Sequence, residues 1–188
     1  MEQESREIAR GLRGRDPDLL DELIVRYQHR LPRYLWTLTG SREAAEDLFQ
    51  ETWIRVLEHG HQYDPRWRFE AWLFSIARNL AIDLLRRREP ESLDGLLSSG
   101  DGRPSRELPD RASTSPFESA AAGEQAERVR HVLRFLPPEA REVLVLRFQE
   151  DLDLNEIAEI VQAPLSTVKS RLYRGLETFR NLLREKEL

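Results

Sequence analysis

The sequence predicts an all-α protein made of two small helical domains joined by a flexible linker. Apolar residues recur every three or four positions over most of the chain, which is the period of an amphipathic helix. No segment alternates apolar and polar residues as a half-buried strand does. Residues 90–125 lose the helical period and are rich in Pro, Gly, Ser and acidic residues, which is typical of a linker. The expected boundaries are therefore 1–89, 90–125 and 126–188.

Composition limits the class of protein. The 188 residues include no cysteine, which excludes disulfides and thiolate zinc sites and fits a reducing cytoplasm. The N-terminus has no apolar core of a signal peptide, and no apolar run approaches the ~18 residues of a membrane span. We expect a cytoplasmic protein that is not inserted in a membrane.

Charge is unevenly distributed. The net charge is −5, yet residues 166–184 hold five basic residues and one acidic residue, and residues 66–88 hold six and two. Local patches, rather than net charge, decide whether a phosphate backbone is bound. Two basic helices, one in each half, therefore stand out against an acidic background.

The first half is expected to begin with a short helix over residues 4–13. The Asp16-Pro17 pair is a helix-start signal, with the acid as cap and proline at the first helical position. The helix that follows is expected to be interrupted or kinked at Pro32. Gly40-Ser41 should end it and cap the next helix.

Two further helices complete the first half. Ser41 to Leu57 has an acidic outer side and an apolar stripe that includes Trp53, Val56 and Leu57 and should face the core, and Gly60 should end that helix. The Asp64-Pro65 pair should begin a third long helix that runs to the arginines at 86–88.

The second half is expected to contain four helical segments: 124–136, 139–149, 155–161 and 166–184. Asp153 and Glu156 form a capping-box pattern before the third segment, and Ser166 is expected to cap the fourth. A short helix, a tight turn and a basic second helix are typical of a helix-turn-helix that binds DNA. Many such turns have glycine where this chain has Gln162, so the backbone there must accept a less permissive residue.

Three stretches resemble bacterial RNA polymerase sigma factors of the extracytoplasmic-function (ECF) group of the sigma-70 family. They are DLFQETWIRVLE at 47–58, FEAWLFSIARNLAIDLLRR at 69–87, and the segment from LPPEAREVLVLRF through LNEIAEIVQAPLSTVKSRLYRGLETFR at 136–180. The resemblance implies that residues 1–89 are sigma region 2, which binds the polymerase clamp and recognises and melts the −10 promoter element. It implies that residues 126–188 are region 4, which binds the −35 element and the polymerase flap. Sigma factors of this type are often held by an anti-sigma protein.

A polar strip lies at helical spacing beside the apolar stripe of residues 41–57. By itself it could be an ordinary solvated face, but the resemblance implies that it binds the clamp of core RNA polymerase. Its members are Asp47, Gln50, Glu51 and Arg55.

Aromatic residues, arginines and an amide gather between residues 63 and 87. Capturing an unstacked base requires stacking and hydrogen bonds to its edge, and the resemblance places a flipped base of the −10 element beside this loop and Asn79. Trp72 is expected in the core, and the terminal arginines could equally complement the helix dipole. The candidates for contact with the −10 element are Tyr63, Asp64, Arg66, Trp67, Arg68, Arg78, Asn79, Arg86 and Arg87.

The last helix offers a base-reading face. Val168 and Leu172 should be core, whereas Lys or Arg side chains on the other side can pair with guanine, at about 1–3 kcal/mol of discrimination for each good contact. The candidates for contact with the −35 element are Ser166, Thr167, Lys169, Ser170, Arg171, Tyr173 and Arg174.

Other functions are less favoured. A helix-turn-helix regulator that acts without polymerase would leave the aromatic loop and the strip at 47–58 as mere core and surface. His59 and His61, near Glu58 and Asp64, lack the further spaced ligands of a metal site. No nucleophile triad, Gly-rich phosphate loop or pair of carboxylates in a pocket can be argued. We therefore expect a protein that is not an enzyme and needs no cofactor or metal.

Overall fold

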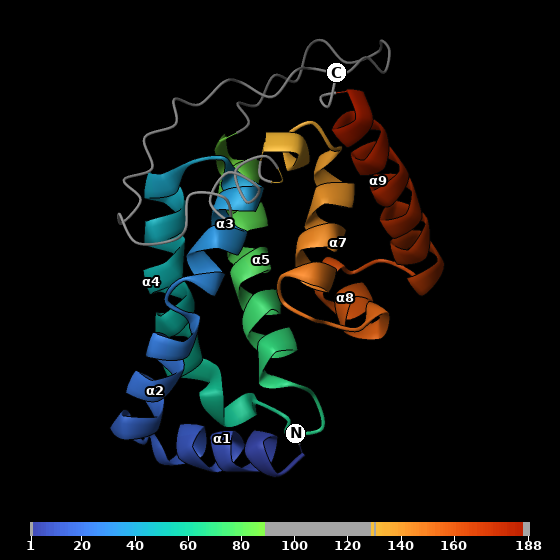
Figure 1. Cartoon of the computed structure of the whole chain (residues 1–188). Coiled ribbons are helices and arrows are strands. Elements are labelled where there is room, and N and C mark those ends of the chain that lie inside the picture. The colour runs from blue at the N-terminus through green and yellow to red at the C-terminus, as the bar shows by residue number, and fades with distance from the viewer. Residues whose placement is uncertain (1, 89–128, 130, 186–188) are drawn as a thin grey trace, which may run out of the picture.

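The computed structural model describes residues 2–88, 129 and 131–185, and within these ranges it contains helices, turns and loops but no strand (Figure 1). The first half consists of α1 (Glu2–Gly14), α2 (Pro17–Tyr27), α3 (Arg30–Thr39), α4 (Arg42–His59), the 3-10 turn η1 (Gly60–Gln62) and α5 (Phe69–Arg88). The second half consists of α7 (Pro138–Phe148), α8 (Leu154–Val161) and α9 (Leu165–Glu185). Residues 129 and 131–133 are also helical. The all-α prediction is confirmed, whereas the expected linker at 90–125 lies outside the described residues.

Helix starts and ends follow the predicted caps in several places. Asp16 accepts hydrogen bonds from the amides of Asp18 and Leu19, and Pro17 is the first residue of α2. Gly40 ends α3 in the left-handed conformation, with φ of 65°. The Ser41 hydroxyl accepts from the Ala44 amide at 3.3 Å and so caps α4.

The break between α2 and α3 falls earlier than predicted. The helices separate at residues 28–29, and Pro32 is the third residue of α3. A proline in the first turn removes no intrahelical hydrogen bond, because the first four amides have no partner there. Pro32 therefore marks the start of a helix and not a kink within one.

The start of α5 also differs from the prediction. The Asp64 carboxylate accepts from the Arg66 amide at 3.0 Å, and the Trp67 amide donates to the Asp64 carbonyl at 3.1 Å. These bonds close a turn, so the helix begins at Phe69 and not at Pro65. Residues 63–68 are thus a structured loop.

Gly60 follows α4 as expected, but for another reason. Its backbone is in the right-handed helical region, which is open to any residue. A Cβ at this position would lie 3.1 Å from the Cβ of Leu12, so the glycine lets α1 approach the end of α4. This packing closes the bottom of the first half (Figure 1).

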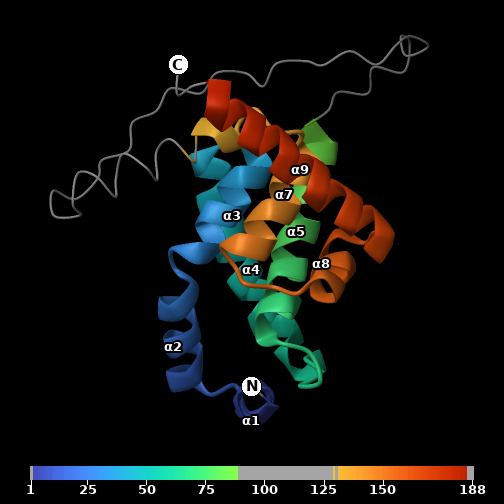
Figure 2. The ribbon, with the colours of Figure 1, turned by 45° about the vertical axis from the view of Figure 1, so that its right-hand side comes forward.

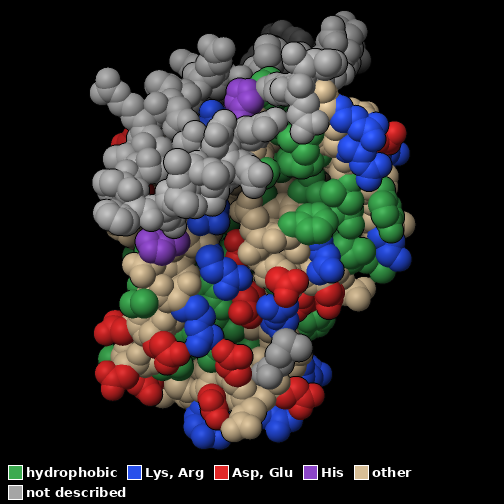
Figure 3. Space-filling model, in the orientation of Figure 1, with side chains coloured by type: hydrophobic (Ala, Val, Ile, Leu, Met, Phe, Trp, Pro, Cys, Tyr) green, Lys and Arg blue, Asp and Glu red, His purple; other side chains and the backbone are tan. Residues whose placement is uncertain are grey.

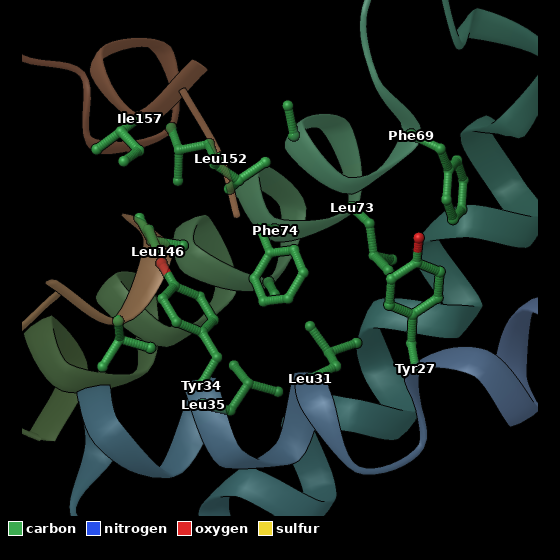
Figure 4. Close-up of a cluster of buried hydrophobic side chains, with 14 of the residues drawn as sticks. Tyr27, Leu31, Tyr34, Leu35, Phe69, Leu73, Phe74, Leu146, Leu152 and Ile157 are labelled. Carbon is green, nitrogen blue, oxygen red and sulfur yellow. The ribbon is translucent and has the colours of Figure 1, made fainter. Parts of the chain in front are cut away.

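The two halves share a core. Helix α5 packs against α8, next to which it lies in Figure 1, and α3 packs against α7, as Figure 2 shows. Tyr34 and Phe74 of the first half are fully buried, and Figure 4 shows them facing Leu146, Leu152 and Ile157 of the second half. The predicted domains are therefore packed together in one closed arrangement.

Candidate nucleic-acid interface

Helices α8 and α9 form the predicted helix-turn-helix. Asp153 accepts from the amides of Asn155 and Glu156 at 2.7 and 2.9 Å, and the Glu156 side chain accepts from the Asp153 amide at 2.8 Å. The predicted capping box is thus present. Gln162 ends α8 with φ of 51° and ψ of 47°, and its amide donates to the carbonyls of Ala158 and Glu159. The turn keeps the left-handed conformation that glycine prefers, without a glycine.

Helix α9 begins one residue earlier than predicted. The Pro164 carbonyl accepts from the amides of Thr167 and Val168 at 2.9 and 3.1 Å. Because these bonds open the helical ladder, Leu165 is the first helical residue and Ser166 lies within the first turn. The prediction that Ser166 caps the helix is wrong, and the residue remains on the exposed side.

One side of α9 packs against α7. Val168 is fully buried and Leu172 is nearly so, as predicted. Gly175 lies at the crossing, where an added Cβ would be 3.1 Å from Leu144 Cδ1 and 3.3 Å from the Ala140 Cβ. The glycine therefore allows the close approach that fixes which side of α9 faces outward.

The outward side of α9 carries most of the candidates for contact with the −35 element. Tyr173 is 67% exposed. The exposed residues are Ser166, Lys169, Tyr173 and Arg174, and the half-buried residues are Thr167, Ser170 and Arg171. Hydroxyl, ammonium and guanidinium groups on one helix face have the donors needed to reach base edges and phosphates.

The polar strip of α4 lies on the surface and includes apolar residues that the sequence did not indicate. Asp47, Gln50 and Arg55 are exposed, and Glu51 is half-buried. Arg55 pairs with Glu51 at 3.1 Å and with Glu58 at 3.4 Å. Beside them, Ile54 and Leu57 are 47% and 48% exposed, although the periodicity assigned Leu57 to the core. A mixed apolar and polar surface is typical of a protein-binding site.

Within the loop before α5, two aromatic residues take opposite positions. Trp67 is 48% exposed, so its ring can stack on a base. Tyr63 is only 1% exposed, with its ring centroid 5.6 Å from Phe69 and 5.2 Å from Trp72. Its hydroxyl donates to the Trp67 carbonyl at 2.7 Å. The structure thus gives Tyr63 a supporting position, and in this arrangement its ring cannot meet a base.

The charged residues of this loop and of the end of α5 lie on the surface. Arg66 pairs with Asp64, with Nε 2.8 Å from Oδ2. This hydrogen bond lowers the pKa of the Asp64 carboxyl. Arg86 and Arg87 are exposed on the last turn of α5. The three arginines can meet phosphates at the molecular surface, whereas the Asp64 carboxylate holds the Arg66 side chain in place.

Three other candidates for the −10 element contact the second half of the chain. Arg78 Nε lies 2.8 Å from Glu142 Oε1. Arg68 donates to the Asp151 carbonyl at 2.9 Å. The Asn79 side-chain oxygen accepts from Gln162 Nε2 at 3.5 Å. The candidates for the −10 element therefore fall into a group on the open surface and a group engaged by the other half.

The acidic partners in this contact were not predicted. Glu142 is 5% exposed. Its place directly before the apolar run 143–146 of α7 is the one sequence signal that could have drawn attention to it. Glu150 and Glu156 gave no such signal. On the face drawn in Figure 3, red and blue side chains interleave where α5 meets α8.

Two general features complete the description of the surface. The part of the chain that the structure describes has no group of three or more His, Cys, Asp or Glu placed to hold a metal ion. Among the described helices, none combines the length and hydropathy needed to cross a membrane.

Comparison with known proteins gives a consistent result. The pattern of the family "Sigma-70 region 2" matches residues 23–91, and that of "Sigma-70, region 4" matches residues 126–179. The chain is 30% identical over 171 residues to the ECF RNA polymerase sigma factor SigW of Bacillus subtilis, and the match covers 90% of this chain and 91% of SigW.

Solved structures of similar fold include two complexes. CnrH, in complex with the cytosolic domain of CnrY, superposes with a TM-score of 0.66 at 23% identity, covering 96% of this chain and 97% of CnrH. The sigma factor RpoE, in complex with the anti-sigma factor NepR from Bartonella quintana, gives a TM-score of 0.65 at 22% identity and covers 87% of this chain and 96% of RpoE.

Proposed function

Because the chain belongs to the extracytoplasmic-function sigma factors of the sigma-70 family, which direct core RNA polymerase to promoters, we propose that its two halves divide the work of promoter recognition. Residues 1–89 act as region 2, on the polymerase clamp and the −10 element. Residues 126–188 act as region 4, on the −35 element and the polymerase flap. The observation that carries this division is the outward face of α9, which presents Lys169, Tyr173 and Arg174 to solvent from a capped helix-turn-helix.

The −35 element is read by α9 in the major groove. Lys169 and Arg174 supply donors for base edges, and Tyr173 and the hydroxyls of residues 166, 167 and 170 add polar and apolar contacts. Arg171 is half-buried and contacts phosphate from the flank of the helix. The buried side of α9 keeps this face in register with the rest of the half.

The −10 element is opened at the loop of residues 63–68 and along α5. Trp67 stacks on an unstacked base, and Asn79 hydrogen-bonds the edge of a flipped base. Tyr63 supports the backbone of Trp67 through its hydroxyl, so we assign it a positioning role. Arg66, Arg86 and Arg87 hold the phosphates of the melted strand, together with Arg68 and Arg78 once these are released from the second half.

The polymerase clamp binds the strip of α4. Asp47, Gln50, Glu51 and Arg55 give polar complementarity, while Ile54 and Leu57 supply the apolar area that a stable contact needs. The protein acts in the cytoplasm as an initiation factor without chemistry of its own. An anti-sigma factor is a further partner, because RpoE, which has a similar fold, forms a complex with the anti-sigma factor NepR.

A regulator that binds DNA without polymerase is not favoured. Such a protein needs no counterpart of region 2, yet residues 23–91 match that region. It would also leave the exposed apolar residues of α4 without a role.

In vitro transcription with purified core polymerase tests the proposal. We expect the protein to produce promoter-dependent transcripts from a genomic fragment library, and Ile54→Asp together with Leu57→Asp to abolish them while leaving DNA binding by the isolated protein unchanged. As a matched control, Val25→Asp alters another exposed apolar residue, 62% exposed on α2, and should keep transcription. No transcript from any fragment, with tight DNA footprints by the protein alone, would contradict the sigma function.

A further inference from the structure

Helix α1 supports the loop of residues 63–68. An added Cβ at Gly60 would lie 3.1 Å from the Leu12 Cβ, so α1 packs directly on the turn that leads into this loop. Burial raises the pKa of Tyr63, and a hydrogen bond of its hydroxyl with Ser5 acts in the opposite direction. Ser5 is itself 8% exposed. The position of α1 relative to the loop is therefore fixed by both apolar and polar contacts.

The two flanks of α1 differ in charge and in packing. On the flank toward α2, Gly11 faces Leu19, and Glu4 accepts from Arg26 Nη1 at 2.7 Å. On the other flank, basic residues recur at spacings of four and three, so their side chains lie along one line of the helix. These residues are Arg6, Arg10 and Arg13, and all three are exposed.

The basic flank lies beside the loop and is largely free of acidic partners. Hydrogen bonds from Arg66 lower the pKa of Asp64, and the nearby charge of Arg13 adds to this effect. Within the described part of the chain, Arg10 and Arg13 have no carboxylate within 4.0 Å, whereas Arg55 of α4 pairs with two. The dipole of α1 favours a cation in its last turn, which accounts for Arg13 but not for Arg10. Two guanidinium groups are thus available next to the loop.

We propose that the flank of α1 formed by Arg6, Arg10 and Arg13 binds phosphates of the single strand that continues from the −10 element toward the transcription start. The proposal rests on the proposed function, which assigns the −10 element to the loop and α5. The loop joins η1, which packs on α1, to the start of α5 (Figure 1). A strand that follows α5 and is captured at Trp67 therefore meets α1 next.

Guanidinium groups suit this role for two physical reasons. Each offers planar donors that match two phosphate oxygens, and neutralising a phosphate releases a bound counterion. Arg10 and Arg13 give up no carboxylate partner on binding, so no ion pair has to be broken first. Because the contact is made to phosphate, it should strengthen binding whatever the base sequence of this segment.

The length of a bound strand tests this site in the complete holoenzyme. A promoter from the fragment library supplies two labelled non-template oligonucleotides, one that ends with the −10 element and one that extends about six nucleotides further, within the span of a single-strand groove. We expect the wild-type holoenzyme to bind the longer strand about tenfold more tightly than the shorter one. With Arg10→Gln plus Arg13→Gln this gain should fall to about twofold, while the affinity for the shorter strand stays unchanged.

Salt dependence identifies the contact as one with phosphate. Each phosphate contact of a single strand contributes about 0.7 to the slope of log affinity against log salt concentration, so the slope for the longer strand should be smaller by about 1.4 in the double variant. Arg10→Lys with Arg13→Lys keeps both charges and should retain most of the gain.

The matched control is Arg33→Gln with Arg42→Gln, which removes two exposed arginines of α3 and α4 and should keep the full gain. Glutamine has a helix propensity close to that of arginine, so the helices should persist in each variant. Circular dichroism checks the helix content, and titration with core polymerase checks assembly.

No gain from the longer strand in the wild type, or an equal gain in the wild type and the double variant, would overturn the site. Weaker binding of the double variant to core polymerase, with the gain on DNA intact, would assign the flank to an acidic protein surface and overturn it as well. Failure of the proposed function is distinct, because the wild-type holoenzyme would then produce no promoter-dependent transcript from any fragment.

Discussion

At the scale of single residues, Asn79 and its neighbour Arg78 differ in exposure. Asn79 lies on the exposed side of α5, while Arg78 is tied to Glu142. We expect Asn79→Ala to reduce strand opening and use of the −10 element by about tenfold, the loss of one or two hydrogen bonds to a base. Binding to duplex DNA with only a −35 element should stay unchanged. Permanganate footprinting reports opening, and anisotropy reports binding.

Asn181→Ala serves as the control for this prediction, because it removes the same side chain from the far end of α9. It should leave opening intact. Equal loss of −35 binding and opening in Asn79→Ala would contradict a role confined to the −10 element.

Lys169 and Arg174 are expected to set which −35 sequence is chosen. Each alanine substitution should cost about 1–3 kcal/mol on the preferred sequence and much less on others, because a base contact carries sequence information and a phosphate contact does not. Arg180→Ala, at an exposed position further along α9, should weaken binding evenly across sequences. Selection of DNA from a random pool measures both effects. A uniform loss in Lys169→Ala and Arg174→Ala would show that neither reads bases.

Sequence reasoning located the candidate residues but not their exposure. The pattern around residue 63 is the same whether a tyrosine faces a base or the core, and only packing against Phe69 and Trp72 buries it. Trp67, by contrast, stands among charged residues in the sequence, and it is 48% exposed in the structure. For Ile54 and Leu57, helical period gives the angle around the helix but not the width of the surface that the other helices cover.

At the scale of secondary-structure elements, most helices were predictable because their period and their caps agree. The starts at Asp16 and Ser41 and the capping box at Asp153 depend on local hydrogen bonds, which short sequence patterns specify. The start at Asp64-Pro65 was wrong, because an aspartate can close a turn with the same groups that cap a helix. Competing local structures of similar energy limit such predictions.

The turn of the helix-turn-helix stores measurable strain. Gln162 has φ of 51°, and the left-handed conformation costs roughly 1–2 kcal/mol for a residue with a Cβ. Gln162→Gly should therefore stabilise the protein by about 1 kcal/mol and raise Tm by roughly 2–4 °C. Gln149→Gly is the matched control, because Gln149 has a right-handed backbone at the end of α7 and should be destabilised by glycine. Thermal unfolding measures both, and a lower Tm for Gln162→Gly would contradict the strain.

At the scale of the whole molecule, the closed arrangement was beyond sequence reasoning. Its contacts join residues far apart in the chain, with a separation of 64 positions for Arg78 and Glu142 and of 120 for Arg30 and Glu150. No local pattern relates such residues, and the intervening segment reads as a linker that would suit either a closed or an open protein. The two halves were thus predictable, but not their association.

Two buried carboxyls, those of Glu150 and Glu156, contribute a pH dependence of stability opposite to that of carboxyls whose pKa falls on folding. Burial raises the pKa of Glu150, against the attraction of Arg30 and Arg33 and together with the repulsion of Glu70. Burial likewise raises the pKa of Glu156, beside Asp153, Arg68 and Glu70. The folded chain therefore binds these protons more readily than the unfolded chain, so their contribution to stability grows as pH falls through the raised pKa and is lost as pH rises.

Comparison of the wild type with Glu150→Gln plus Glu156→Gln isolates this contribution. Other carboxyls titrate in both proteins, so the difference in Tm reflects the two glutamates. As the pH falls from about 7.5 to about 5, a window above the ordinary carboxyl pKa, we expect the Tm of the wild type to rise relative to the Tm of the variant. Glutamine can keep the capping box of α8. A difference that shifts in favour of the variant at acid pH would contradict the raised pKa values.

The buried Glu142 carboxylate joins three helices, because Tyr34 of α3 and Arg78 of α5 both donate to it from the first half of the chain. A single substitution at Glu142 would therefore leave two donors of the other half without their acceptor. The outward face of α9 lies apart from this contact, and its residues would stay as they are. The association of the two halves and the proposed reading of the −35 element thus depend on separate residues of this molecule.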